Sequence, residues 1–354
     1  MNILITLIGL SIVIFLHELG HMLAAKRAGI GVSEFSLGMG PKLFSYQWGE
    51  TEYTLRLLLL GGFVRLTGLD DDTDRDAPNA YPNKSIMQRF WTIFWGPLMN
   101  LILGFVIFLG IFSYQGIPDN GRLIVDGVTP NFPAEIAGVY KNDILLKVDH
   151  IQLKSIQQLS AYLNQNKEEN KGKEVSLTLI RSGNEKVIVM TPKLHQGKYI
   201  VGLTFSPILK KGSILEVVAH SISTTKFYVL SVFKGIGMLV TGKASIKEMT
   251  GPIGIIQFAS FNLNKGIVYF FNVMAMISIS LGVINLFPFP VLDGGHIIML
   301  VIEAIRGKSL NQKWFVLINN IGAAALISLM VFIIVNDIRF WQDRINLFKS
   351  IFGP

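Results

Sequence analysis

Four long apolar stretches most constrain how this chain can fold. They cover roughly residues 2–25, 91–114, 267–287 and 315–335. Each is long enough for a helix to cross a lipid bilayer, which takes about 20 residues. The chain is 50% hydrophobic with a mean hydropathy of +0.47, which is too apolar for an ordinary soluble protein. The sequence therefore predicts a mainly α-helical, polytopic membrane protein with four transmembrane helices.

Positively charged residues beside these stretches predict their orientation. The loops after the first stretch, before the second, and between the third and fourth contain Lys26, Arg27, Lys84, Arg89, Arg306, Lys308 and Lys313. Cytoplasmic loops carry an excess of Lys and Arg, so these loops are expected in the cytoplasm and the long 115–265 segment outside. The first stretch lacks a basic n-region and exceeds the usual signal-peptide core of about 7–15 residues, so we expect it to be retained as a span.

An HExxH motif, His17-Glu18-Leu19-Gly20-His21, lies inside the first apolar stretch. On a helix the two imidazoles lie on one face, where they can share a metal ion, and Glu18 can take a proton from a metal-bound water. Residues 1–16 contain no charged side chain, and an ionisable group in such a segment is costly and indicates a functional site. The motif predicts a metal-dependent hydrolase with its active site in the bilayer, near the cytoplasmic end of the first span.

A catalytic zinc ion usually has three protein ligands and one open position for water. The chain has no cysteine, so the ligands must be histidines and carboxylates. Two prolines and two glycines interrupt the segment 285–296 after the third stretch, and irregular backbone at membrane depth is tolerated where it lines a cavity. Asp293 and His296 are both candidates for the third ligand, and spacing alone does not choose between them. Asp293 could instead cap the helix that starts near Gly294.

Residues 34–66 alternate in polarity and predict strands with a turn at Gly49. The apolar segment 57–64 within them is too short to span as a helix and contains Gly61 and Gly62. It is either a hairpin that dips into the membrane and pairs with an extended substrate, or an ordinary strand that covers the helices. The acidic segment 70–76 lacks the EF-hand spacing, which favours a solvated loop over a calcium site.

Residues 121–205 differ in pattern from the long apolar stretches and predict a small α+β domain. Short strands are expected at 123–125, 143–148, 175–180 and 186–189, with a helix at 156–164 capped by Ser155. Residues 206–264 have helical periodicity with several lysines and are expected to lie on the outer membrane surface. The predicted organisation is therefore a membrane region 1–120, the inserted domain 121–205, the surface segment 206–264, and a second membrane region 265–354.

Together these motifs resemble the site-2 protease family of intramembrane zinc metalloproteases, in particular the bacterial regulator-of-sigma-E protease group. The resemblance covers nearly the whole chain. Its elements are the HExxH motif, the segment 285–294, the 96–100 segment similar to the family's GxxxN element, the 61–64 segment similar to its membrane-dipping β-loop, and the 251–254 segment. The 121–205 domain resembles a single PDZ domain, whereas the best-known enterobacterial members have two.

The resemblance implies one zinc ion per chain, with His17, His21 and Asp293 as its ligands and Glu18 as the base that activates water. It also implies a set of substrate-binding residues: Asn285, Pro290, Gly61, Gly62, Phe63 and Val64. Asn100 is expected near the site, although a contact between helices explains this residue equally well.

The predicted reaction is hydrolysis of a peptide bond in a single-span transmembrane substrate, in a bacterial cytoplasmic membrane. The resemblance implies cleavage of an anti-sigma factor, clearance of signal-peptide remnants, or both, with the PDZ-like domain outside and the active site open to the cytoplasm. A non-catalytic adaptor is disfavoured by the intact HExxH motif, and a zinc transporter by the few polar residues in the second and fourth stretches. The predicted partners are such membrane proteins and the lipid bilayer. No basic stripe with interleaved aromatics indicates nucleic acid, despite a net charge of +8.

Overall fold

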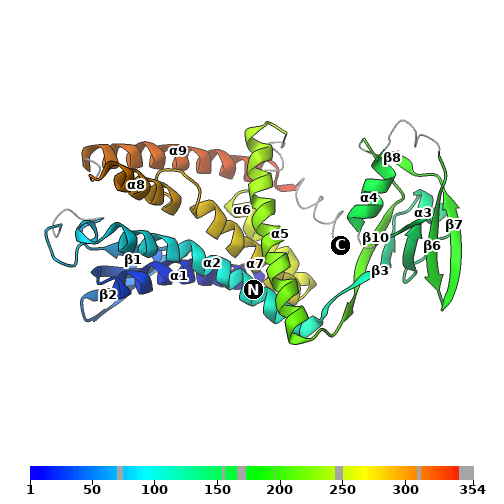
Figure 1. Cartoon of the computed structure of the whole chain (residues 1–354), viewed down its shortest axis with the longest axis horizontal. Coiled ribbons are helices and arrows are strands. Elements are labelled where there is room, and N and C mark those ends of the chain that lie inside the picture. Colours follow the sequence, from blue (N-terminus) through cyan, green and yellow to red (C-terminus); the bar gives the residue numbers. More distant parts are fainter. Residues whose placement is uncertain are drawn as a thin grey trace. The chain divides into compact units, whose positions relative to one another are not determined.

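The computed structural model describes residues 1–69, 75–153, 156–165, 173–195, 197–243, 250–308 and 312–342. The predicted cap Ser155 and most of the acidic 70–76 segment lie outside these described residues. The chain divides into two compact units, which we call the helical unit (Met1–Ile111 with Val218–Pro354) and the inserted unit (Phe112–Val217). Figure 1 shows the elements of both units.

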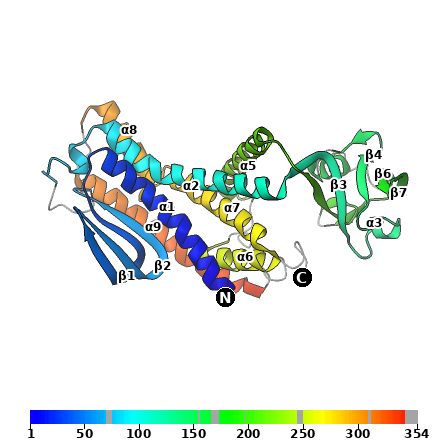
Figure 2. The same ribbon diagram turned by 90° about the horizontal axis from the view of Figure 1, so that it is seen from below.

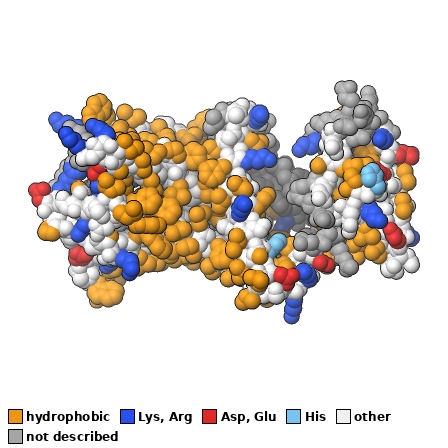
Figure 3. All heavy atoms as spheres, in the orientation of Figure 1, with side chains coloured by type: hydrophobic (Ala, Val, Ile, Leu, Met, Phe, Trp, Pro, Cys, Tyr) orange, Lys and Arg blue, Asp and Glu red, His pale blue; other side chains and the backbone are white. Residues whose placement is uncertain are grey.

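The described residues contain four helices that are long and apolar enough to cross a membrane, as the sequence predicts. They are α1 (Asn2–Arg27), α2 (Ile86–Gln115), α7 (Ile267–Asn285) and α9 (Gln312–Arg339). Hydrophobic side chains cover most of the visible surface of the helical unit, with Lys and Arg side chains gathered at the end where α8 and α9 meet (Figure 3). A wide apolar outer surface of this kind suits lipid as the surrounding solvent.

The described part of the helical unit also contains α6 (Pro252–Lys265), α8 (Asp293–Arg306) and most of α5 (Ile214–Val240). The buried carboxylate of Asp337, near the end of α9, accepts hydrogen bonds from the backbone N–H groups of Gly251 and Gly254, each 2.9 Å long. A carboxylate at a helix N-terminus satisfies unpaired N–H groups and complements the helix dipole. The 251–254 segment thus fastens α6 to α9.

The strands β1 (Val32–Trp48) and β2 (Thr51–Leu66) form the predicted hairpin around Gly49, but the sheet is more complex than a simple hairpin. Tyr53 pairs with Tyr46 on one side and with Phe35 on the other, and Phe35 in turn pairs with Val64. Across the sheet the segments therefore follow the order 42–48, 51–56, 32–37 and 62–66. The segment 62–66 forms one edge, and the sheet lies along α1 (Figure 2).

The inserted unit contains a six-stranded sheet in the order β10-β3-β4-β6-β7, with β5 paired to β4. The elements of the inserted unit are β3 (Ile117–Val128), α3 (Pro133–Ile136), β4 (Ile144–Val148), β5 (Ile151–Gln152), α4 (Ile156–Asn164), β6 (Val175–Arg181), β7 (Asn184–Met190), β8 (Lys193–His195), β9 (Lys198–Ile200) and β10 (Leu203–Lys210). The short helix η2 (Tyr81–Asn83) belongs to the helical unit. The predicted strands and the helix at 156–164 are confirmed. The sheet extends beyond the predicted limits 121 and 205, because β3 and β10 pair with each other as far as Ile117 and Lys210.

A charged turn lies immediately before the strand β4 of the inserted sheet. Asn142 has a left-handed backbone (φ 73°), a conformation that asparagine tolerates better than most residues. Burial alone would raise the pKa of the Asp143 carboxyl, but hydrogen bonds from Arg181 and from the backbone N–H of Tyr140 outweigh burial and hold this pKa below its ordinary value. The Arg181 guanidinium also lies over the Tyr140 ring, 4.4 Å from its centroid, which ties the turn to β6.

Candidate metal centre

Helix α1 and the start of α8 bring three potential metal ligands together. His17 and His21 lie four residues apart on one face of α1 and are both buried, and Asp293 is the first residue of α8. The His17 Nε2 atom is 3.2 Å from His21 Nε2 and 3.2 Å from an Asp293 carboxylate oxygen. The other Asp293 oxygen is 3.4 Å from His21 Nε2.

These distances fit a tetrahedral zinc site. Zinc bonds to nitrogen and oxygen are about 2.0–2.1 Å long, so the ligand atoms of a tetrahedral site lie about 3.3–3.4 Å from one another. The two Nε2 atoms are separated by about this distance, and each lies 3.2–3.4 Å from one of the two Asp293 oxygens. Two imidazoles and one carboxylate form a donor set that suits zinc. His296, the rival ligand, is not a member of this group; its ring packs against Phe315 at a centroid distance of 5.6 Å.

The second nitrogen of each imidazole faces a polar group on α2. His21 Nδ1 lies 2.9 Å from the Thr92 carbonyl oxygen, so Nδ1–H donates to this carbonyl and Nε2 keeps its lone pair for a metal. His17 Nδ1 lies 3.2 Å from the carboxamide of Asn100, which is fully buried. The Asn100 Oδ1 atom has no hydrogen-bond partner as oriented. A half-turn of the carboxamide lets this oxygen accept the His17 Nδ1–H, which would fix His17 in the same ligand-ready tautomer.

The His21 ring occupies the space where a side chain at position 96 would lie, so this position needs a glycine. A Cβ atom at position 96 would lie only 2.1 Å from His21 Nε2. In the opposite direction, a Cβ atom at Gly20 would lie 2.5 Å from the Trp95 carbonyl oxygen. Two glycines therefore allow α1 and α2 to approach closely. The sequence marks Gly96 only as part of a segment that resembles a family element, and nothing in its spacing indicates that it makes room for His21.

Glu18 faces the edge of the β1–β2 sheet. The backbone of Val64 is a hydrogen-bond partner of the Glu18 carboxylate, and a Cβ atom at Gly62 would lie 3.3 Å from Glu18 Cγ. Among the described residues, β1 is the only strand paired with this part of β2. The outer edge of β2 at 62–65 and the Glu18 carboxylate therefore meet beside the three potential ligands.

A cavity of about 330 Å³ joins these groups. Its lining comes from α1, the edge of β2, α2 and the segment before α8: His17, Glu18, His21, Phe63, Val64, Leu66, Leu69, Ile93, Asn285, Val291, Leu292, Asp293 and His296. The Phe63 ring lies under two guanidinium groups, those of Arg56 and Arg65, at 5.2 and 5.6 Å. Six of the thirteen lining residues carry polar or ionisable side chains, so this cavity is unusually polar for a site inside an apolar helix bundle.

The other predicted substrate-binding residues occupy different positions. The Asn285 carboxamide lies in the cavity, 3.2 Å from His17 Nε2. Pro290 does not line the cavity but packs against Gly322 of α9, where a Cβ atom would lie 2.5 Å from Pro290 Cβ. Gly61 (φ 121°) faces Met39. The next residue after Pro290, Val291, has a φ of 78°, a strained conformation for a β-branched residue and one that concentrates at functional sites.

An ion pair that the sequence analysis did not identify holds α8 against α2. Arg89 donates two hydrogen bonds to the Glu303 carboxylate, at 2.6 and 3.0 Å, and lies over the Tyr81 ring. A bidentate pair of this type fixes both distance and orientation. Because Asp293 is the first residue of the same helix, this ion pair also helps to fix the position of the Asp293 carboxylate.

Comparison with known proteins gives matches over most of the chain. The family model of Peptidase family M50 matches residues 5–329. A candidate zinc metalloprotease of Clostridium acetobutylicum is 33% identical over 341 residues, which cover 95% of this chain and 97% of that protein. The regulator of sigma-W protease RasP of Bacillus subtilis and the zinc metalloprotease RasP of Geobacillus kaustophilus are each 29% identical over 407 residues, 92% of this chain and 95% of those proteins.

Proposed function

This chain belongs to peptidase family M50 and is a zinc metalloprotease, and we propose that it hydrolyses peptide bonds within the membrane-spanning segment of single-span proteins. The observation that carries this proposal is the position of the potential ligands. Two histidines, a carboxylate and a neighbouring glutamate converge on the most polar part of an apolar helix, beside the outer edge of the β1–β2 sheet. A soluble peptidase would not need this combination.

In this proposal His17, His21 and Asp293 hold one zinc ion per chain. When bound, zinc supplies an acidified water and polarises the scissile carbonyl. The Glu18 carboxylate takes the proton of that water and passes it to the leaving amine. Asn100 and the Thr92 carbonyl hold the two imidazoles in the tautomer that binds metal.

The edge of β2 is proposed to bind the substrate backbone. A transmembrane helix shields its peptide bonds with internal hydrogen bonds, so a local segment must unwind before it can be cleaved, and its freed N–H and C=O groups then need new partners. The segment 61–64 offers a strand edge for this purpose, and the Asn285 carboxamide offers a further donor and acceptor in the cavity. Pro290 is proposed to act by holding the turn that carries Asn285 and Asp293, since it packs on α9.

The proposal also covers the kind of substrate and the orientation of the protein in the membrane. One relative is named as a regulator of sigma-W protease, which favours cleavage of an anti-sigma factor here, and clearance of signal-peptide remnants remains compatible with the same site. We place the protein in a bacterial cytoplasmic membrane with the basic ends of its spans in the cytoplasm. The inserted sheet and helices, predicted at 121–205, would then be an extracytoplasmic PDZ-like domain between membrane regions 1–120 and 265–354, with 206–264 along the membrane surface.

Metal removal tests the proposed chemistry. Purified protein in detergent should cleave a tagged single-span substrate, lose this activity after treatment with a chelator, and regain it when one equivalent of zinc is added back. Cleavage is followed by gel mobility, and zinc by elemental analysis of the same samples. Undiminished cleavage by protein shown to be free of metal would contradict the proposal.

The substitution Gly62→Ala tests the substrate edge. An alanine Cβ at this position would lie 2.9 Å from the Ser36 carbonyl oxygen and 3.3 Å from Glu18 Cγ, so the edge must move by a few tenths of an ångström. We expect kcat/KM to fall about tenfold, because misplacement of a substrate by a fraction of an ångström is costly, while zinc content stays unchanged. A wild-type kcat/KM for this variant would show that the edge does not position the substrate.

A further inference from the structure

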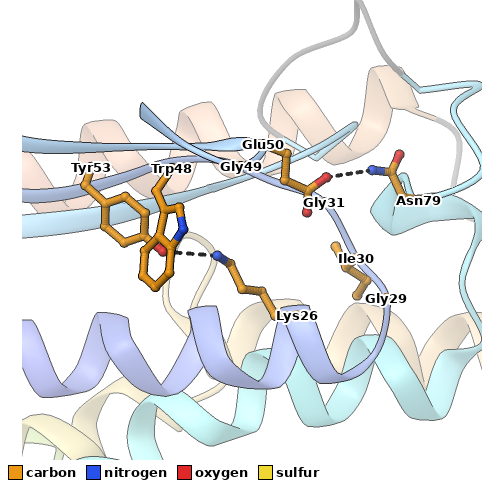
Figure 4. A pocket seen from close by; sticks show the side chains of 9 residues that line it. All are labelled: Lys26, Gly29, Ile30, Gly31, Trp48, Gly49, Glu50, Tyr53 and Asn79. Atoms are coloured by element: carbon orange, nitrogen blue, oxygen red, sulfur yellow. Dashed lines mark hydrogen bonds between the residues drawn. The ribbon is translucent and has the colours of Figure 1, made fainter. Parts of the chain in front are cut away.

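A second cavity, of about 450 Å³, lies where α1 ends (Figure 4). It is lined by Lys26 at the end of α1, by the segment 29–31, by the turn 48–50, and by Tyr53 and Asn79. Its volume falls within the range of about 300–1,000 Å³ that is usual for small-molecule sites. None of these residues belongs to the candidate metal centre, so the cavity needs an explanation of its own.

Two opposite charges line this cavity, and each is bound to a neutral partner. Lys26 Nζ donates to the Tyr53 hydroxyl at 3.1 Å, and the Glu50 carboxylate accepts from the Asn79 amide at 3.3 Å (Figure 4). In the described part of the chain no ion pair within 4.0 Å joins Lys26 to Glu50. The Lys84 ammonium is a second cation near the cavity, since a Cβ atom at Gly29, one of the lining residues, would lie 3.6 Å from Lys84 Nζ. Such a cavity suits a ligand that carries one negative and one positive group.

The remaining wall is aromatic. The Trp48 side chain is 71% exposed, and its ring centroid lies 6.2 Å from that of Tyr53. Tryptophan has the most favourable face for a cation such as an ammonium group. Tryptophan and tyrosine also concentrate where a membrane protein meets the headgroup region of the bilayer.

The cavity lies beside the ends of two predicted membrane spans. Lys26 is in the last turn of α1, and Lys84 lies just before α2 begins at Ile86. Both helices have the length and hydropathy of membrane spans. The cavity therefore lies at the level where two spans leave the hydrocarbon core, which is the level of the lipid headgroups.

We propose that this cavity binds the phosphoethanolamine headgroup of a membrane phospholipid. The phosphate is held by Lys26 beside the Tyr53 and Trp48 rings, with Lys84 close by, and the ammonium group faces the Glu50 carboxylate on the other side of the cavity (Figure 4). A purely anionic headgroup would leave a negative charge beside Glu50, which like-charge repulsion disfavours. Soluble phosphoethanolamine carries the same two groups, but the end of a membrane span favours the form attached to lipid. This proposal does not depend on the peptidase reaction.

Lipid binding to the purified full-length protein tests the proposal. Native mass spectrometry in detergent would follow titrations with dioleoyl phosphatidylethanolamine, dioleoyl phosphatidylglycerol and soluble O-phosphoethanolamine. We expect one phosphatidylethanolamine to bind in preference to phosphatidylglycerol. The variants Lys26→Gln and Glu50→Gln should each raise its dissociation constant about tenfold, since each removes one charge-assisted contact. The matched control Lys308→Gln replaces an exposed lysine outside this cavity and should bind like the wild type.

Unchanged zinc content and unfolding temperature in Lys26→Gln and Glu50→Gln would show that both variants fold. Several results would overturn the proposal: equal retention of both lipids, wild-type binding by the two variants, or soluble O-phosphoethanolamine binding as tightly as the lipid. Competition for the cavity by a peptide from the flank of a substrate, without any preference between lipids, would also overturn it and would indicate a peptide site.

Discussion

Replacing Glu18 with glutamine should abolish turnover while leaving zinc in place. Glutamine keeps the size of the side chain and can still face the Val64 backbone, but it cannot take a proton from water at neutral pH. We expect kcat to fall about 1,000-fold, which corresponds to about 4 kcal/mol of lost transition-state stabilisation. The measurement is single-turnover cleavage of a tagged single-span substrate, with zinc determined on the same preparation.

The matched control for Glu18→Gln is Glu185→Gln, an exposed position on β7, which should have wild-type kcat. Near-normal turnover of Glu18→Gln would remove Glu18 from the role of base. Loss of zinc together with loss of turnover would instead show that Glu18 supports the metal site, and the role of base would have to be tested by another substitution.

Gly96→Ala should cost the protein its zinc, although position 96 offers no ligand. The new Cβ would lie 2.1 Å from His21 Nε2 and 2.4 Å from the adjacent ring carbon, so the imidazole must leave the position where it meets Asp293 and His17. We expect zinc affinity to fall at least about 100-fold, comparable to or larger than the effect of removing a partner of a metal ligand. Competition with a chromogenic chelator would measure it, and cleavage would fall in parallel.

Gly110→Ala is the matched control in the same helix, because a Cβ atom at Gly110 would have no neighbour within 4 Å. Alanine is a better helix former than glycine by about 1 kcal/mol, so the control should fold and bind zinc at least as well as the wild type. Wild-type zinc affinity in Gly96→Ala would mean that α1 and α2 can separate without disturbing His21, and that the close approach of the two helices is not needed for the site.

The sequence was most informative where chemistry depends on local spacing. The positions of His17 and His21 on one helical face follow from the helical period, and the four apolar stretches follow from the thickness of a bilayer. The strands and the helix of the inserted unit could be predicted for the same reason, since alternation and periodicity are local patterns. Which of Asp293 and His296 joins the two histidines could not be decided from spacing, because that choice depends on how α8 is turned against α1.

Features that depend on contacts between distant segments could not be predicted. The space that Gly96 leaves for His21, and the ion pair between Arg89 and Glu303, join residues of different helices. The order of segments in the β1–β2 sheet is a further example. Alternation predicts strands, but it does not show that segment 32–37 lies between two parts of β2 and leaves 62–66 at the edge. Long-range pairing of this kind leaves no periodic signal in one sequence.

The outer edge of β2 at 62–65 has a direction as well as a position. A chain that pairs with it runs either with it or against it, and the two arrangements present different carbonyl groups to a fixed point beside the strand. The groups at His17, Glu18 and Asp293 are fixed by helices, so the two chain directions would present a scissile carbonyl to them in different orientations. In a membrane, chain direction is the same as protein orientation. If the β2 edge binds substrates as proposed, the enzyme would favour one orientation of a membrane protein over the other, before any side chain of the substrate is recognised.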